Sequence, residues 1–388
     1  MFTYPEELKV QWLNLFSTAA SFVLAVGMVA IAIDVIISLR SGRRAARNPW
    51  KAGTLEWAVP YPVPQFNFAS VPRVEGRYPL WDRPETDEAT DRADGLLGKP
   101  GDGRRELLGT GILTAAPEQV IRVSTSTWIP VLSALVLSAL LACFIAKWYL
   151  GAALMALPLL ALFAVWAWTT GHRQAAVRHE AEPGLVLPTQ YACRNAPGWW
   201  ALVVSLLIDG ALFASLVFAY FYLWLGAEPW PPEGIAVGGL GLPLLALGLL
   251  AGCAVAAQWA WRALGAGSDG GAREAVRPTL QTLKGQPAWL VAALLGAGFI
   301  ATHWLALAGP VGAPQAHAYA AVVWTLAGFH MLHVAVAALA AVFVAARIRC
   351  GYASAARPLE ARVVAALWRY TVAQGVVTWA VIHLFPRM

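Results

Sequence analysis

Apolar residues gather in eight stretches of about twenty residues along this chain, and polar or basic segments separate them. A bilayer core of about 30 Å is crossed by about 20 apolar residues in helical form. We therefore predict an all-α polytopic membrane protein with eight transmembrane helices. The helices are expected near residues 15–38, 128–146, 149–169, 199–225, 240–262, 288–308, 318–346 and 363–385.

Composition and charge support this prediction and add an orientation. The chain is 59% apolar and 13% charged, whereas soluble domains carry roughly 25% charged residues. Of the 28 Lys and Arg residues, all but Lys9, Lys147 and Arg387 fall in alternate loops or at the helix ends beside them. Short cytoplasmic loops collect positive charge, so both termini are expected outside the cytoplasm. The net charge of +6 then indicates topology rather than nucleic-acid binding.

Three parts are expected along the chain. Residues 1–82 comprise one span and a tail that is dense in proline and aromatic residues, which favours an extended path over a protein surface. Residues 83–122, acidic and then glycine-rich, predict a flexible cytoplasmic linker. Residues 123–388 hold seven spans, of which the first two form a hairpin around a tight turn at Lys147 and Trp148.

One acidic side chain, Asp209, lies near the middle of an apolar stretch. A carboxylate in hydrocarbon costs at least about 2.5–3.5 kcal/mol, so we expect it to have a partner within the bundle. His330 and His333 share a face of another span at comparable depth. A carboxylate–imidazole contact would lower the cost of both groups. The cluster could simply join two helices, or it could handle lipid or protons.

Two other classes of membrane protein could use the same residues. Asp209, His330 and His333, with His303 as a further ligand, could form a zinc or non-haem iron site in an intramembrane metalloenzyme. Bundle di-iron proteins use repeated Glu and Glu-x-x-His pairs, which this chain lacks, so we predict no metal and no catalytic residue here. A proton-coupled transporter is disfavoured by the absence of an internal repeat. Arg347 favours anchoring at the cytoplasmic surface, with binding of an anionic lipid headgroup as the alternative.

With these motifs in view, the last seven spans resemble subunit III of the haem-copper oxidases. The most specific match is the run from Gly328 to Val334, which reads Gly-Phe-His-Met-Leu-His-Val. The family usually has Glu at the position of Asp209, and it often has Trp-x-His-Phe where this chain reads Trp-Arg-Tyr-Thr from Trp368. The resemblance implies a two-plus-five helix bundle whose cleft holds ordered phospholipid. The residues that match the cleft-lining pattern are Asp209, His330, His333 and Arg347.

Residues 1–82 are similar to the last span and cytoplasmic tail of subunit I of the same enzymes. The similarity rests on Trp12-Leu13-Asn14, Thr54-Leu55-Glu56-Trp57 and Phe66-Asn67-Phe68. It implies that this chain is the end of a subunit I/III fusion, and that the earlier spans with the haem and copper ligands lie outside this sequence. The tail residues expected to dock on subunit I are Glu56, Trp57, Phe66 and Phe68.

The resemblance implies an accessory, non-redox part of a respiratory terminal oxidase in the bacterial inner membrane. Such an oxidase reduces oxygen to water and couples this to proton pumping. The chain would stabilise the catalytic subunit, hold phospholipid and support proton uptake. Haem and copper are expected in its partners, a subunit I that lacks its last helix and a subunit II, through which cytochrome c would bind. We favour a cytochrome c oxidase of the aa3 or caa3 type over a quinol oxidase.

Overall fold

The structure is a computed structural model, and the chain divides into two compact units, which are treated separately below. The first unit is Met1–Phe68 with Val74–Arg92, and the second is Ala69–Arg73 with Ala93–Met388. The residues that the structure describes are 9–43, 45–59, 74–83, 105–111, 113–123, 127–169, 178–182, 185–193, 195–227, 229–233, 235, 238–265 and 280–387.

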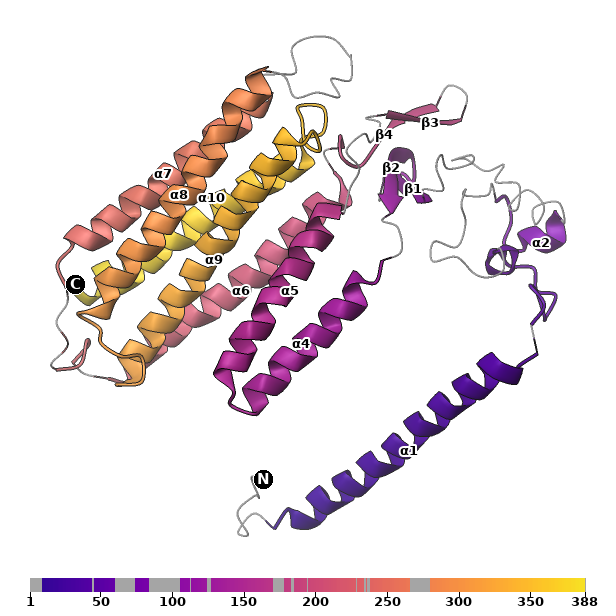
Figure 1. Cartoon of the computed structure of the whole chain (residues 1–388), viewed down its shortest axis with the longest axis horizontal. Coiled ribbons are helices and arrows are strands. Elements are labelled where there is room, and N and C mark those ends of the chain that lie inside the picture. The colour runs from indigo at the N-terminus through magenta and orange to yellow at the C-terminus, as the bar shows by residue number, and fades with distance from the viewer. Residues whose placement is uncertain are drawn as a thin grey trace. The chain divides into compact units, whose positions relative to one another are not determined.

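The first unit is built on one long apolar helix, α1 (Gln11–Ser41), shown in indigo in Figure 1. Its 31 residues give a length of about 46 Å at 1.5 Å per residue, enough to cross a bilayer core. None of its side chains is buried within the part of the chain that the structure describes. The apolar surface of α1 therefore has no partner within its own unit.

After α1 the chain turns back on itself around a tryptophan. A 3₁₀ turn (Leu55–Ala58) and the short helix α2 (Pro79–Asp82) lie close together. The indole nitrogen of Trp81 donates to the Lys51 carbonyl at 3.0 Å, and its ring lies where a side chain on Gly53 would stand. This packing requires glycine at position 53.

The second unit contains the other seven helices, and all eight predicted segments are helical. The helices are α4 (Ile129–Ile145), α5 (Tyr149–Thr169), α6 (Pro197–Leu225), α7 (Gly241–Gly265), α8 (Leu280–Ala308), α9 (Ala318–Arg349) and α10 (Leu359–Trp379). After α10 the chain continues as a π-helical turn (Ala380–Leu384) and a 3₁₀ turn (Phe385–Arg387).

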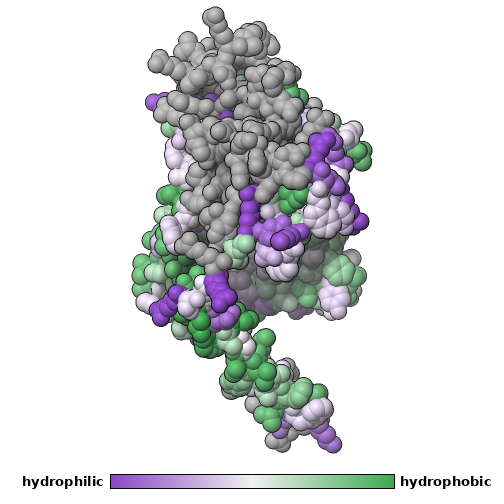
Figure 2. Space-filling model, turned by 90° about the vertical axis from the view of Figure 1, so that its right-hand side faces the viewer, coloured by the Kyte–Doolittle hydropathy of each residue, from purple (hydrophilic) through white to green (hydrophobic). Residues whose placement is uncertain are grey.

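Among the described residues, six helices are long and apolar enough to cross a membrane, namely α1 and α5 to α9. Helix α4, with 17 residues, is shorter than this, and α10 carries more polar and charged side chains along its length. The chain is thus a mostly helical, multi-pass membrane protein, and the predicted number of eight spans stays a prediction. Figure 2 shows the broad hydrophobic areas that the helices present on one face of the molecule.

Two β-hairpins in the polar loops depart from a purely α-helical fold. Strands β1 (Arg105–Thr110) and β2 (Pro117–Val123) pair antiparallel, as do β3 (Arg178–Glu182) and β4 (Leu185–Pro188). Val120 and Leu187, one from each hairpin, form a small buried cluster. The first hairpin lies in the segment expected to be a flexible linker. Its apolar contact is made to a strand more than sixty residues away, so no local pattern predicts it.

Helices α6 to α10 form the main core, with α9 packed against α6, α8 and α10. Many of its buried residues are alanines, including Ala320, Ala327, Ala337 and Ala341, and small residues let helix backbones approach closely in membranes. Helices α4 and α5 pair with each other through the tight turn at Lys147, which has a positive φ of 56°. Figure 1 shows this hairpin beside α6 and the helices of the core. The hairpin was predicted from the sequence and is confirmed.

Candidate functional site

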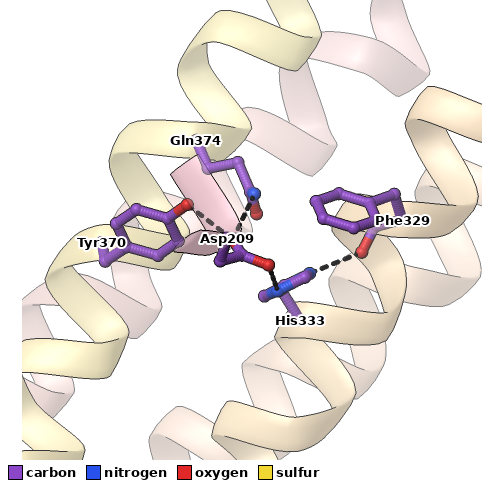
Figure 3. Close-up of polar contacts among 5 residues, drawn as sticks. All are labelled: Asp209, Phe329, His333, Tyr370 and Gln374. Atoms are coloured by element: carbon purple, nitrogen blue, oxygen red, sulfur yellow. Dashed lines mark hydrogen bonds and ion pairs between the residues drawn. The ribbon is translucent and has the colours of Figure 1, made fainter. Parts of the chain in front are cut away.

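Asp209 is the centre of a hydrogen-bonded cluster that joins α6, α9 and α10 (Figure 3). Its Oδ1 lies 2.8 Å from Nε2 of His333 on α9. Its Oδ2 accepts hydrogen bonds from the Tyr370 hydroxyl at 2.5 Å and from the Gln374 side-chain amide at 3.3 Å, both on α10. The half-buried carboxylate thus has the partner that the sequence predicts, and two more.

The contact between Asp209 and His333 holds one proton. Nδ1 of His333 lies 2.8 Å from the Phe329 carbonyl oxygen, and because a carbonyl can only accept, Nδ1 carries a hydrogen. A 2.8 Å contact between Nε2 and a carboxylate oxygen then needs a hydrogen between them, on either the imidazole or the acid. In both arrangements the pair as a whole is neutral, which lowers the cost of placing it among apolar helices.

Helix geometry explains why these four side chains meet. Tyr370 and Gln374 are four residues apart on α10 and so lie on one face. Asp209 is followed by Gly210, where an added Cβ would stand 3.7 Å from the Tyr370 hydroxyl. This is an ordinary contact distance, so an alanine at position 210 would also fit beside the tyrosine.

His330 does not join this cluster, although it is only three residues from His333. Its Nε2 lies 3.0 Å from the Thr371 carbonyl oxygen, and its ring contacts Phe299 edge to face at 5.1 Å between centroids. A side chain on Gly375 would stand 2.6 Å from the His330 ring. The imidazole is therefore held in the interior of the core, next to the backbone of α10.

The expected carboxylate–imidazole contact is made by His333, whereas His330 contacts the Thr371 carbonyl instead. Residues three apart on a helix differ by about 60° around its axis, which is enough here to direct the two rings at different neighbours. Among the residues that the structure describes, no three His, Cys, Asp or Glu side chains are placed to hold a metal ion. The metalloenzyme alternative built on Asp209, His330 and His333 therefore has no common site.

Arg347, expected at the cytoplasmic surface of the membrane, is buried within the protein at the end of α9. Its guanidinium donates twice to the Glu360 carboxylate, at 2.7 and 2.5 Å, and once to the Trp168 carbonyl at 3.0 Å. It also lies over the ring of Tyr352, 4.3 Å from its centroid. Trp168 packs edge to face on Phe343. Arg347 therefore fastens the end of α5 to the start of α10 and the end of α9.

A pocket of about 390 Å³ opens beside this contact. Its lining comes from three helices: Phe163, Trp166 and Ala167 on α5, Phe343 on α9 and Glu360 on α10. The volume falls within the range of about 300–1,000 Å³ that is usual for ligand pockets. The pocket is open to the outside and lies between the hairpin and the five-helix core at this end, with an apolar wall and one carboxylate.

The tail residues predicted to dock on another subunit are only partly described. Glu56 is exposed and Trp57 half-buried, and the Trp57 ring packs edge to face on Trp50 at 5.0 Å. Phe66 and Phe68 lie outside the described residues.

The cluster contains residues that the sequence did not single out as a site. Gln374 is a polar side chain within a predicted span, and such side chains commonly make interhelical hydrogen bonds, as it does here with Asp209. Tyr370 and Glu360 were not selected. The sequence gives only a weak indication of these two residues. Tyr370 precedes Gln374 by one helical turn. Glu360 is an acidic residue at the start of a predicted span, and the preceding span ends in arginines.

Comparison with known proteins gives partial matches. No protein-family model matches the chain. It is 39% identical over 82 residues to cytochrome c oxidase subunit 1 of Alkalihalophilus pseudofirmus, which covers 21% of this chain and 13% of that protein. It is 40% identical over 62 residues to heme-copper oxidase subunit I+III of Aeropyrum pernix, covering 16% and 8%. It is 34% identical over 61 residues to cytochrome bo(3) ubiquinol oxidase subunit 1 of Buchnera aphidicola, covering 15% and 9%.

These matches relate about a fifth of the chain to subunit I of the haem-copper oxidases. The chain spans between 8% and 13% of the length of these relatives. They support a terminal-oxidase context for the chain.

Proposed function

We propose that this chain is an accessory part of a respiratory terminal oxidase of the cytochrome c oxidase type, with no redox centre of its own. In this proposal α1 supplies the last helix of the catalytic subunit, and the seven later helices act as its subunit III. Haem and copper belong to parts of the enzyme outside this sequence. The observation that carries the proposal is the similarity to the relative from Aeropyrum pernix, whose name joins subunits I and III.

Two further observations support this role. The match of 82 residues has the same length as the segment 1–82 that resembles subunit I in its motifs. The helix of that segment, α1, exposes an apolar surface around its whole circumference. Such a helix is stable only in lipid or against other helices, as the last span of a larger subunit would be.

The seven-helix part is proposed to hold phospholipid in the pocket between α5, α9 and α10. The apolar lining suits an acyl chain, and Arg347 and Glu360 lie together at its end. The Asp209 cluster is proposed to hold α6, α9 and α10 together beside this cleft and so to support assembly and proton uptake. Eight spans, with both termini outside the cytoplasm of a bacterial inner membrane, complete the proposal.

The electron donor is proposed to be cytochrome c rather than a quinol. Of the relatives reported above, the one named cytochrome c oxidase is 39% identical to this chain and the one named ubiquinol oxidase is 34% identical. The runner-up is therefore the same accessory role in a quinol oxidase. Oxidation of added reduced cytochrome c by the purified complex separates the two.

Filling the pocket tests the lipid role. Ala167→Phe places a ring in the space between α5 and α9 and is expected to lower the phospholipid retained by the purified complex, as measured by native mass spectrometry. Leu160→Phe, on the same helix at a site 61% exposed, adds a ring outside the pocket and serves as the matched control. Equal lipid retention in the two variants would show that this pocket is not the lipid site.

A further inference from the structure

A row of polar side chains runs along the inner face of α10, away from Asp209. Gln374 and Thr378 lie on consecutive turns, and His383 follows five residues later. Five residues of regular α-helix would turn His383 about 140° away from Thr378. The π-helical turn Ala380–Leu384 adds the extra residue, because its hydrogen bonds run from i to i+5. All three side chains are buried as a result.

His383 meets two other buried histidines at this level of the core. Its ring packs edge to face on His303 of α8, with 5.5 Å between centroids. His303 in turn stacks on Phe299 at 5.2 Å, and Phe299 also contacts His330 edge to face at 5.1 Å. The three imidazoles come from α8, α9 and the end of α10, and none is more than 6% exposed.

These histidines have nitrogen atoms without partners among the described residues. They are both ring nitrogens of His303, Nδ1 of His330 and Nε2 of His383. The Thr371 hydroxyl and the Gln374 side-chain oxygen nearby on α10 are likewise unpaired within the part that the structure describes. These six polar atoms lie on α8, on α9 and along α10 and the turn that follows it, from Thr371 to His383.

Burying these polar atoms without any hydrogen-bond partner would lower the stability of the folded chain. A neutral imidazole has one donor and one acceptor, and each buried polar group without a partner costs about 1–3 kcal/mol. Buried water molecules pair with such groups in folded proteins, typically making about three hydrogen bonds each. A cluster of donors and acceptors within one small region is the setting that such water needs.

A small cavity beside His383 gives space for water at one of the three histidines; His303 and His330 are not among its lining residues. Its volume is about 20 Å³, and its lining includes Tyr319, His383 and Arg387. About 10–15 Å³ is enough to hold one water molecule. The Arg387 guanidinium donates to the carbonyls of His383 and Gly238 and closes this end of the core.

From these observations we propose that His303, His330 and His383 form an internal water-binding site within the core of α6 to α10. The bound water donates to and accepts from the unpaired ring nitrogens. The site does not depend on the oxidase assignment.

X-ray hydroxyl-radical labelling in H₂¹⁸O, read by mass spectrometry on the full chain in its native complex, tests this site. Radicals made from bound water oxidise the side chains beside it even when these are buried. We expect label on Phe299 and His303, which are 3% and 1% exposed. Cys253 is the control, since it is fully buried, reacts readily with hydroxyl radicals and donates its thiol to the Ala292 carbonyl. Label absent from both Phe299 and His303 would overturn the proposal.

Two variants give an independent result. His303→Leu removes both ring nitrogens at similar volume, and His303→Gln keeps a donor and an acceptor. If water is bound, the leucine variant loses the label on Phe299 and has a lower Tm, while the glutamine variant keeps most of both. If the region is dry, removing two unpaired nitrogens raises the Tm of the leucine variant, and that result would contradict the water site.

Discussion

Replacing Glu360 with glutamine is expected to destabilise the seven-helix part by about 3 kcal/mol. The change leaves the Arg347 guanidinium buried without a counter-charge, and breaking a buried ion pair in this way costs about 3–5 kcal/mol. The lower end applies because the Glu360 side chain is 27% exposed. The measurement is thermal and denaturant unfolding of the detergent-solubilised chain, followed by tryptophan fluorescence.

Two further variants make this result specific. Glu233→Gln removes an exposed carboxylate in the loop between α6 and α7 and should change stability by less than about 0.5 kcal/mol. Arg347→Met combined with Glu360→Gln should recover much of the loss, since an apolar side chain then replaces the unpaired charge. A Glu360 variant as stable as the Glu233 control would mean that Arg347 does not depend on this carboxylate.

Asp209→Ala is expected to lower stability by about 2–4 kcal/mol, because it removes three interhelical hydrogen bonds that contribute about 0.6–1.7 kcal/mol each in membrane proteins. Asp209→Asn should retain most of that stability, because its amide can donate to Nε2 of His333 while its oxygen accepts from Tyr370 and Gln374. Unfolding measurements on both variants check the ranking. The haem absorbance of an assembled complex is expected to be unchanged in either, while the alanine variant loses bound lipid or inactivates faster during turnover.

The length of the acidic side chain at position 209 gives a second ranking. Tyr370 already stands 2.5 Å from the carboxylate and His333 2.8 Å from it. An added methylene in Asp209→Glu would therefore displace one of them. We expect this variant to be less stable than Asp209→Asn and to be rescued by Tyr370→Phe, which removes the hydroxyl in the way. If Asp209→Glu were as stable as the unsubstituted chain, the cluster would have space for the added methylene without displacing either partner.

The sequence predicted the elements of this fold better than their contacts. Helix positions follow from runs of apolar residues, and these were correct for all eight segments. The strands β2 and β4 were missed because the apolar residues that join them, Val120 and Leu187, are too few and too far apart to form a pattern. A transmembrane helix is recognised from about twenty consecutive apolar residues, whereas these strands are held together by one small cluster of apolar side chains.

Only the parts of the candidate site that follow from the free-energy cost of burying a charged side chain could be predicted from the sequence. An acid within a span requires a partner, which made Asp209 and a nearby histidine predictable. Which of His330 and His333 it contacts depends on the rotation of α9, and this rotation is set by packing over the whole core. The same holds for Arg347, whose burial requires the carboxylate of Glu360 from the next helix.

Tyr370 shows how two departures from the family pattern meet. The subunit III family usually has Glu at the position of Asp209 and often has a histidine at that of Tyr370. In this structure the shorter acid is reached by the longer tyrosine. The two differences, unrelated in the sequence, are thus neighbours in space.

The most direct test of the central claim is to purify the tagged chain from its native membranes in mild detergent and record the reduced-minus-oxidised haem spectrum. Co-purifying proteins are identified by mass spectrometry. The account predicts a haem signal in an assembly that also contains the preceding spans of subunit I, and no haem left on this chain once the assembly is dissociated. A chain that purifies without any haem protein, or that keeps haem by itself, would contradict it.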